Sequence, residues 1–438
     1  MGGGLMQLVA YGAQDIYLTG NPQITFFKVV YRRHTNFAME SIEQTFNGAV
    51  DFGKRVTATI SRNGDLIKDM WLELEFADTV ALDNAVYGLG NALVKLVEIE
   101  IGGQLIDRQY GEWLDIWSEL SVPEGKRVGY DTMVGNVPNT QLGSSDTDSD
   151  TWKTASRKYT KAKLDVPLMF WFNRNPGLAL PLIALQYHEV KINLDIETAA
   201  NLRRGTLGNN LAFAGDRLRL WVDYIYLDTD ERRRFAQVSH EYLIEQLQFT
   251  GDESLTSGST KRVDLNFNHP CKELIWVGQK STQKRGGGAA SEPCKFSRLG
   301  TDGTSNTMRV KLQLNGQDRF QERRQEYFLN VQTYKHHTHM PRSSRLVCLL
   351  SKEYLNDTDT DPFDERPIYE DNSQFIYVYS FALNPEEHQP SGTCNFSRID
   401  NATLQLTYVN ITGVLKVFAV NYNVLRIMSG MGGLAYSN

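Results

Sequence analysis

The chain carries one pattern of strands twice. Five segments of its first half have counterparts in the same order in its second half: Ser41–Gly48 with Ile244–Gly251, Lys54–Val56 with Lys261–Val263, Val97–Gln104 with Val310–Gln317, Val190–Leu194 with Ala402–Leu406, and Trp221–Leu227 with Ala419–Leu425. The offset between partners stays between 198 and 213 residues, as insertions and deletions in loops would produce. Short alternating strands also resemble one another by chance, but five colinear matches favour a duplicated domain.

The repeated segments read as β-strands. Apolar and polar residues alternate in Thr57–Ile60, Trp71–Phe76 and Val97–Ile101, which places one face of each strand on a core. Short strands separated by turn residues predict an all-β fold of antiparallel sandwiches or jelly rolls. One amphipathic helix is expected at Tyr110–Leu120, packed on a sandwich through its apolar stripe.

The length fits two domains. The 438 residues allow two β-domains of about 200 residues each. The charged connector Asp228–His240 separates them, so we predict an N-terminal arm over 1–25, a first domain over 26–235 and a second over 236–438. Long polar loops are expected to form an exposed surface at Gly129–Lys161, Gly278–Thr307 and Lys352–Ser373.

Charge and cysteine usage narrow the function classes. A net charge of −6 argues against direct binding of nucleic acid. The four cysteines, Cys271, Cys294, Cys348 and Cys394, contain no CxxC pair and are interpreted as reduced thiols of a protein folded in a cytosol-like compartment. The apolar runs are too short to span a bilayer, and the N-terminus does not have the pattern of a signal peptide.

The motifs of common active sites are incomplete. Gly53-Lys54 and Gly125-Lys126 are each followed by Arg, which does not fit a phosphate-binding loop. The calcium-like spacings at 146–150 and 357–361 lack the glycine that such a loop needs at its sixth position. The cluster His336, His337 and His339 has no further metal ligands at suitable spacing. The sequence therefore assigns no catalytic residue, no cofactor-binding residue and no metal ligand.

Four Asn-x-Ser/Thr sequons are candidate glycosylation sites: Asn356, Asn395, Asn401 and Asn410. Asn356 lies in an acidic loop and is expected to be the most accessible, whereas the other three lie beside or at the ends of expected strands.

Blocks along the whole chain resemble one family. They are Leu8–Asp15, Leu18–Lys28, Tyr31–Phe37, Ile60–Leu66, Pro176–Val190, Gln389–Asp400 and Asn421–Tyr436. These blocks are similar to those of the major capsid proteins of large icosahedral DNA viruses, in particular the algal (chlorella virus) branch.

The resemblance implies a double jelly roll, that is, two tandem eight-stranded antiparallel jelly rolls with few short helices. It also implies homotrimeric capsomers in the virion, minor capsid proteins beneath them, an internal lipid membrane, and glycans on outward loops, often at asparagines outside ordinary sequons. Assembly in the host cytoplasm is expected.

The duplication suggests a geometric function. Three copies of a chain with two similar domains present six similar sides, and such a pseudo-hexagon can tile an icosahedral facet. The arm would reach partners at the base of the capsomer. Two alternatives remain: a minor capsid or penton paralogue, and a carbohydrate-binding protein, which would need a cleft with exposed aromatic residues and paired carboxylates.

Overall fold

The computed structural model describes most of the chain: residues 6, 9–10, 12–23, 26, 34–76, 86, 88–136, 163–202, 213–286, 291–300, 308–341 and 374–436. Residues 1–37 and 38–438 form two separate units. The first contains the short helix α2 (Ile16–Thr19) and is described by itself. The second contains all the sheets described below, apart from the first residue of β1.

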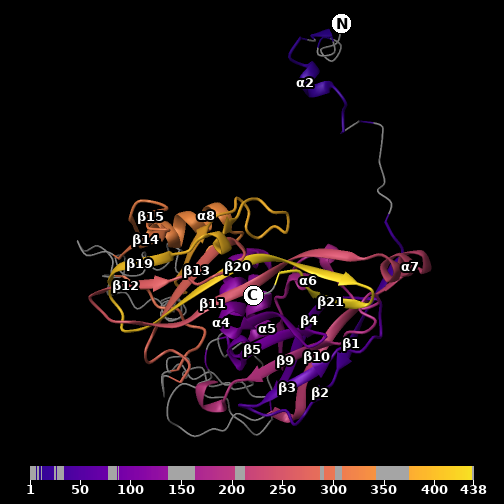
Figure 1. The fold of residues 1–438 in the computed structure, drawn as a ribbon, viewed down its shortest axis with the longest axis horizontal. Helices are drawn as coiled ribbons and strands as arrows, with labels where there is room; N and C mark the ends of the chain where they lie inside the picture. The colour runs from indigo at the N-terminus through magenta and orange to yellow at the C-terminus, as the bar shows by residue number, and fades with distance from the viewer. Residues whose placement is uncertain are drawn as a thin grey trace, which may run out of the picture. The chain divides into compact units, whose positions relative to one another are not determined.

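Two sheets are built from strands between Phe37 and Leu227, here called the first half (Figure 1). One has the order β1 (Phe37–Gln44), β10 (Phe213–Leu227), β4 (Leu66–Phe76), β7 (Lys163–Pro167), with β8 (Leu180–Pro181) on β4. The other has the order β2 (Phe46–Asn47), β3 (Arg55–Thr59), β9 (Val190–Ile196), β5 (Val94–Ile101), β6 (Gln104–Tyr110).

Two further sheets use strands between His240 and Leu434, here called the second half. One has the order β11 (His240–Leu255), β20 (Gly413–Met428), β13 (Pro270–Lys280), β17 (Ile376–Ser380), with β18 (Cys394–Asn395) on β13 and β21 (Met431–Leu434) on β20. The other has the order β12 (Ser259–Asp264), β19 (Ala402–Val409), β14 (Arg309–Leu314), β15 (Gln317–Asp318), with β16 (Arg323–Arg324) on β14.

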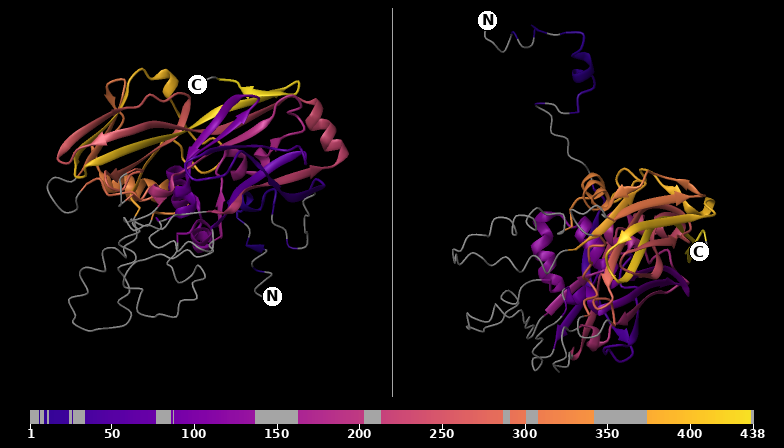
Figure 2. Two further views of the ribbon diagram at one scale, coloured as in Figure 1. Left: turned by 90° about the horizontal axis from the view of Figure 1, so that it is seen from below. Right: turned by 90° about the vertical axis from the view of Figure 1, so that its left-hand side faces the viewer.

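Both halves have the same strand order. Without the short strands β2, β8, β16, β18 and β21, the described part of each half keeps eight strands, arranged 1-8-3-6 in one sheet and 2-7-4-5 in the other. This is the order of a jelly roll, so the predicted double jelly roll is confirmed. The halves lie beside each other in two views, coloured indigo to magenta and pink to yellow (Figures 1 and 2).

The repeat in the sequence falls on equivalent strands. Val97 pairs with Leu194 in the first half, and their counterparts Val310 and Leu406 pair in the second. The hairpins that follow turn through Gly102-Gly103 and Asn315-Gly316, all with positive φ, as a two-residue type I′ turn requires.

One match is out of step. Trp221 and Ala419 lie on the equivalent strands β10 and β20, but Ala419 points into the core of its half whereas Trp221 lies on the outer face of its sheet. The strand pairing of β10 and of β20 contains register shifts, and a single extra residue moves a side chain to the opposite face.

Helices fill the connections between strands. They are α3 (Leu89–Leu93), α4 (Gly111–Ser121), α5 (Glu124–Val134), α6 (Trp171–Arg174), α7 (Thr229–Gln237) and α8 (Gln332–His336), with the short turns η3 (Pro176–Leu178), η4 (Ala199–Leu202), η6 (Tyr327–Val331) and η8 (Phe396–Arg398). The helix expected at Tyr110–Leu120 is confirmed as α4. No described helix has the length and apolar character needed to cross a membrane.

One of the expected loops was placed too early in the sequence. The loop expected from Gly129 starts later, because α5 continues to Val134 and buries Arg127, Tyr130 and Val134 at helical spacing. The connector between the halves contains the helix α7. In α5 two glycines obscured the helical pattern, and α7 has no buried residue that would produce one.

Candidate functional site: the joint between the two halves

An apolar interface joins the halves. The α4 side chains Trp113, Ile116, Trp117 and Leu120 pack against the outer face of the β11–β20–β13–β17 sheet, on Ile275, Val277, Ile376, Val378, Phe418 and Val420, and on Phe296 of the segment after β13. Leu114 on the same helix packs into the core of the first half instead. Helix α4 therefore lies between the two jelly rolls and contacts both.

A buried guanidinium links the halves beside this interface. Arg285 follows β13 in the second half, and its Nε donates to Glu112 Oε1 over 2.7 Å. Its other nitrogens donate to the carbonyl oxygens of Ala92 and Val94, each over 3.0 Å, and to the carboxylate of Glu197. Arg285 thus binds two carboxylates and two backbone carbonyls of the first half.

Glu112 binds a second cation from the other half. Lys416 Nζ, on β20, lies 2.9 Å from Glu112 Oε1, and both side chains are buried. Burial alone would raise the pKa of Glu112, but the charges of Arg285 and Lys416 outweigh it and hold the pKa at about 2. Glu112 therefore stays ionised inside the joint across the physiological pH range.

Gly111 allows this close approach. A Cβ at this position would lie 2.2 Å from the carbonyl oxygens of Asn91 and Val94, and 2.8 Å from Arg285 Nη2. These contacts are shorter than any that real side chains make, and two of the partners are backbone atoms. Glycine is thus required where α4 begins, because the chain passes directly over the carbonyl groups of Asn91 and Val94, the second of which also binds Arg285.

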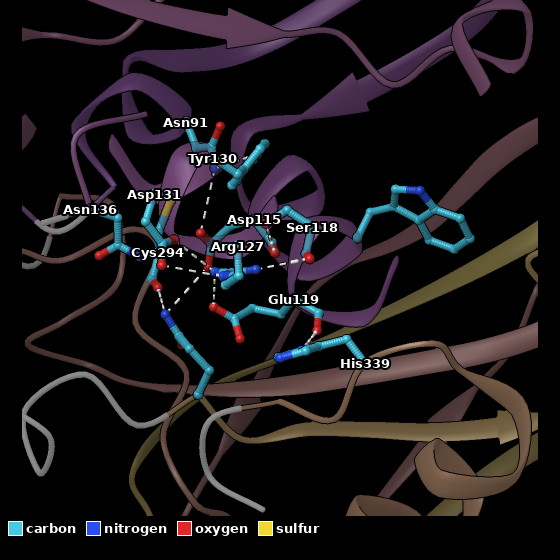
Figure 3. A network of polar contacts seen from close by, with 12 residues as sticks. Asn91, Asp115, Ser118, Glu119, Arg127, Tyr130, Asp131, Asn136, Cys294 and His339 are labelled. Atoms are coloured by element: carbon cyan, nitrogen blue, oxygen red, sulfur yellow. Dashed lines mark hydrogen bonds and ion pairs between the residues drawn. The ribbon is translucent and has the colours of Figure 1, made fainter. Parts of the chain in front are cut away.

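A second charged cluster surrounds Arg127 on α5 (Figure 3). Its guanidinium contacts the carboxylates of Glu119 and Asp131 and donates to Ser118 O over 2.9 Å. From the second half, His339 contacts the carbonyl oxygen of Glu119 over 2.7 Å. This cluster fixes the α4–α5 corner and connects it to the segment after α8.

A third cluster lies at the β11 edge of the joint. Glu245 binds Lys272 Nζ and Arg174 Nη1, each over 2.7 Å. The Arg174 guanidinium also lies 4.1 Å from the ring centroid of Trp117 on α4. Residues from α4, α6, β11 and β13 are held together in this way, with the Lys272 side chain fully buried.

Backbone contacts extend the joint beyond α4. Leu247 N on β11 donates to Asp107 Oδ1 on β6 over 3.0 Å. Tyr187 N donates to Gly430 O over 3.0 Å, and Ile244, Leu425 and Ile427 of the second half lie in the core of the first. Burial raises the pKa of Asp107 to about 6, although the bonds from Leu247 and Gln109 oppose this.

The side chains of the three clustered histidines do not meet at one site. His336 contacts Leu383 O, His337 lies between Glu273 and Glu386, and His339 contacts Glu119 and Glu124. Among the residues that the structure describes, no group of three or more His, Cys, Asp or Glu side chains is placed to hold a metal.

His337 is buried between two carboxylates. Its ring nitrogens lie 3.1 Å from Glu273 Oε2 and 2.8 Å from Glu386 Oε1. Burial alone would lower the pKa of His337, but the two carboxylates outweigh it and raise the pKa to about 9. The imidazolium therefore connects β13 to the loop that carries Glu386, next to the ring of Trp117.

The sequon asparagines Asn395, Asn401 and Asn410 are all exposed. Asn395 Oδ1 accepts from Ser397 N over 3.0 Å and begins the turn η8. Asn356 and the two calcium-like spacings lie outside the described residues. A shallow pocket of about 120 Å³ at Gly53–Arg55 and Asp195–Thr198 is smaller than the roughly 300 Å³ at which small-molecule sites begin.

The charged residues of the joint were missed by sequence reasoning. One signal was available: Lys416 interrupts the apolar run Val414–Val420, and Lys272 precedes another in β13. A lysine within a buried strand needs a buried partner. The identity of that partner depends on the packing of the halves, which no sequence pattern encodes.

Comparisons with known proteins agree with this architecture. The family model described as the major capsid protein N-terminus matches residues 25–228, and the model for the large eukaryotic DNA virus major capsid protein matches 231–348 and 371–433. The major capsid protein of Pyramimonas orientalis virus is 56% identical, and that of Paramecium bursaria Chlorella virus 1 is 43% identical, with all of both chains covered in each case.

A solved structure has the same fold. VP54 of PBCV-1 covers 94% of this chain and 100% of its own, with a TM-score of 0.73 and 37% sequence identity. The Faustovirus major capsid protein, at 13% identity and a TM-score of 0.68, shares the fold.

Removing the buried guanidinium should strongly destabilise the protein. Arg285→Ala leaves Glu197 without its cation and Glu112 with Lys416 alone, which should cost about 3 to 5 kcal/mol. The control is Arg426→Ala, which removes an ion pair whose side chains are 51% and 58% exposed and should cost at most about 1 kcal/mol. Denaturant unfolding compares the two, and equal losses would contradict the role of Arg285.

The charged state of His337 should make stability depend on pH. Its pKa is higher in the folded protein, so its contribution, on the order of 3 kcal/mol, is fully present below about pH 6.5 and is lost as the pH rises through about 9. His337→Gln should therefore lose most stability at pH 6 and little at pH 9.5. His336→Gln retains His337, so its free energy of unfolding, measured with denaturant at each pH, should depend on pH as in the wild type. A constant difference between His337→Gln and wild type at all pH values would contradict this.

Proposed function

The chain belongs to the major capsid proteins of large eukaryotic DNA viruses, and from this premise we propose that three copies form a pseudo-hexagonal capsomer. It is a structural protein of the virion capsid, and such capsomers would tile the facets of an icosahedral shell. The observation that carries the proposal is the joint, because a hexagonal outline from three chains requires two jelly rolls at one fixed angle.

Two features make the joint suitable for this task. Its apolar centre, around Trp113 and Trp117, is buried and excludes water from the adjoining charged groups. The charged groups fix the relative orientation of the halves, since the planar guanidinium of Arg285 binds its four acceptors in only one arrangement. Rotation of one jelly roll against the other would break these bonds.

The parts of the chain have separate roles in this proposal. Residues 26–235 and 236–438 are the two jelly rolls, and each jelly roll supplies one side of the hexagon, so that three copies supply six. Residues 1–25 are an arm that binds neighbouring proteins at the capsomer base. The arm belongs to the separate unit 1–37, and three of its apolar residues, Val9, Tyr17 and Leu18, are each at least 73% exposed. Apolar side chains at this exposure favour a binding segment.

Further partners are also proposed. Neighbouring capsomers would surround each trimer, minor capsid proteins would lie beneath it, and glycans would extend from outward loops, with Asn356, Asn395, Asn401 and Asn410 as candidate sites. Assembly would take place in the host cytoplasm. The protein would catalyse no reaction and bind neither a cofactor nor nucleic acid.

The alternatives are less well supported. A minor capsid or penton paralogue is not favoured, because the relatives from Pyramimonas orientalis virus and Paramecium bursaria Chlorella virus 1, each matched over all of its length, are major capsid proteins. A carbohydrate-binding protein would use exposed aromatic residues beside carboxylates. Trp71 and Trp221 lie beside Glu73 in this way, but on the outer face of a sheet, for which the next subsection gives another explanation.

The solution mass tests the capsomer. We expect three times 49.7 kDa, or about 149 kDa, by size-exclusion chromatography with light scattering. A protein that stays at 49.7 kDa at high concentration would contradict the proposal.

Deletion of residues 1–25 tests the arm. The trimer mass should be reduced only by the deleted residues, because the arm lies outside the unit that contains the joint, whereas electron microscopy should show no assembled shells. A milder variant, Tyr17→Ser with Leu18→Ser, should also reduce shell assembly and leave the trimer intact, since both side chains are exposed apolar groups of the arm. Loss of the trimer itself would show that the arm acts within the capsomer.

A further inference from the structure

The duplication leaves one sheet face without its equivalent cover. In the second half, the outer face of the β11–β20–β13–β17 sheet is buried beneath α4 of the first half. The equivalent sheet of the first half is β1–β10–β4–β7. On its outer face Trp71, Glu73, Asp165 and Trp221 are only half-buried, and Glu43 is exposed.

The centre of this face is an aromatic pair. Trp71 and Trp221 are directly opposite each other on β4 and β10, and their rings stack at 6.4 Å with an interplanar angle of 11°. Trp221 Nε1 donates to Glu73 Oε2 over 2.7 Å, which fixes one ring. Rigid tryptophans on an open surface are typical anchors of protein interfaces.

The helical segment of the second half that corresponds to α4 exposes the side that α4 buries in the joint. In the first half α4 lies between β6 and β7, and in the second half η6 and α8 lie between β15 and β17. Phe328 and Leu329 of η6 pack into their own core, as Leu114 of α4 does. The side that corresponds to Trp113 and Trp117 is exposed in a single copy.

This exposed side is apolar. Val331 is 38% exposed and Tyr334 77% exposed. Leu383, 71% exposed, lies on a loop next to the end of α8, since its carbonyl oxygen is 2.8 Å from His336 Nδ1. We call Val331, Tyr334 and Leu383 the helix patch.

The two surfaces carry mainly opposite charges. Lys335, Arg323 and Arg324 are exposed near the helix patch, whereas Glu43, Glu73, Asp165 and Asp223 lie on the strands around the tryptophan pair, where the cation Arg219 pairs with Glu43. Opposite charges around apolar centres favour one docking partner and one orientation. Both views place α8 and the β1–β10–β4 region toward opposite ends of the unit that contains the sheets (Figures 1 and 2).

We propose that η6 and α8 of each copy dock through the helix patch on the Trp71–Trp221 face of the next copy. This contact repeats between chains what α4 does within one chain. It is head-to-tail, and such a contact closes into a ring when the rotation is right, here after three copies. The proposal rests on the proposed homotrimer and names the surfaces that form it.

Charge substitutions in the helix patch test the contact. Tyr334→Glu and Leu383→Glu should each weaken trimerisation by about a hundredfold, because a carboxylate would be buried against Glu73 and Asp165. The light-scattering mass should fall from about 149 kDa toward 49.7 kDa, while the circular dichroism spectrum stays that of wild type. Tyr408→Glu, at a tyrosine 49% exposed on β19, is the control and should remain trimeric.

A second measurement tests directly whether the Trp71–Trp221 face is covered in the trimer. Hydroxyl-radical oxidation of Trp71 and Trp221 should be roughly tenfold slower in the wild-type trimer and in Tyr408→Glu than in monomeric Tyr334→Glu, because the core of an interface excludes water. Equal oxidation in trimer and monomer would show that the helix patch does not cover this face.

The outcomes separate the two proposals. A monomeric wild type would overturn the homotrimer and the docking contact together. A trimeric wild type whose Tyr334→Glu and Leu383→Glu variants stay trimeric would overturn only the docking contact. Slower oxidation of both tryptophans in a monomeric wild type on addition of an oligosaccharide would favour the carbohydrate-binding alternative.

Discussion

A cation buried between carboxylates fixes the relative orientation of the two jelly rolls. Arg285 of the second half binds Glu112, Glu197 and two carbonyl groups of the first, and Gly111 makes room for it. Apolar contacts around α4 bring the halves together, but such contacts are not directional and tolerate small rotations. Buried ion pairs contribute little net stability, because desolvation offsets attraction, yet they penalise every arrangement that leaves a charge unpaired. The angle between the halves is therefore set chiefly by polar groups.

The duplicated architecture gives the same element two environments. The centre of the outer face of the second half is apolar, and its charged side chains Lys416 and Glu273 are buried and paired, as expected for a surface that is covered as soon as the chain folds. The outer face of the first half mixes Trp71 and Trp221 with Glu73 and Asp165, as expected for a surface that must remain soluble until a second copy arrives. The two outer sheet faces thus differ in composition according to whether the helix that covers them belongs to the same chain or to another copy.

The sequence predicted the fold well and the joint poorly. Alternation such as Val97–Ile101, repeated at Val310–Leu314, was sufficient for the duplication because strand period and turn residues are local properties. The match of Trp221 with Ala419 joined residues that point to opposite faces, because bulges shift the strand period by one residue. Arg285 could not be recognised, since its partners come from α3, β5, α4 and the loop after β9, far away along the chain. The apolar stripe of α4 was visible, but not the sheet on which it packs.

The last long strand, β20, has a consequence for biosynthesis. Leu425 and Ile427, near the end of β20, lie inside the core of the first half together with Ile244. Translation delivers the N-terminal jelly roll long before these side chains leave the ribosome. That domain must wait with part of its interior unfilled, and maturation of both domains becomes a single late event. A chain that ends prematurely would then be incomplete in both domains, which gives quality control a simple criterion for keeping truncated subunits out of the growing lattice.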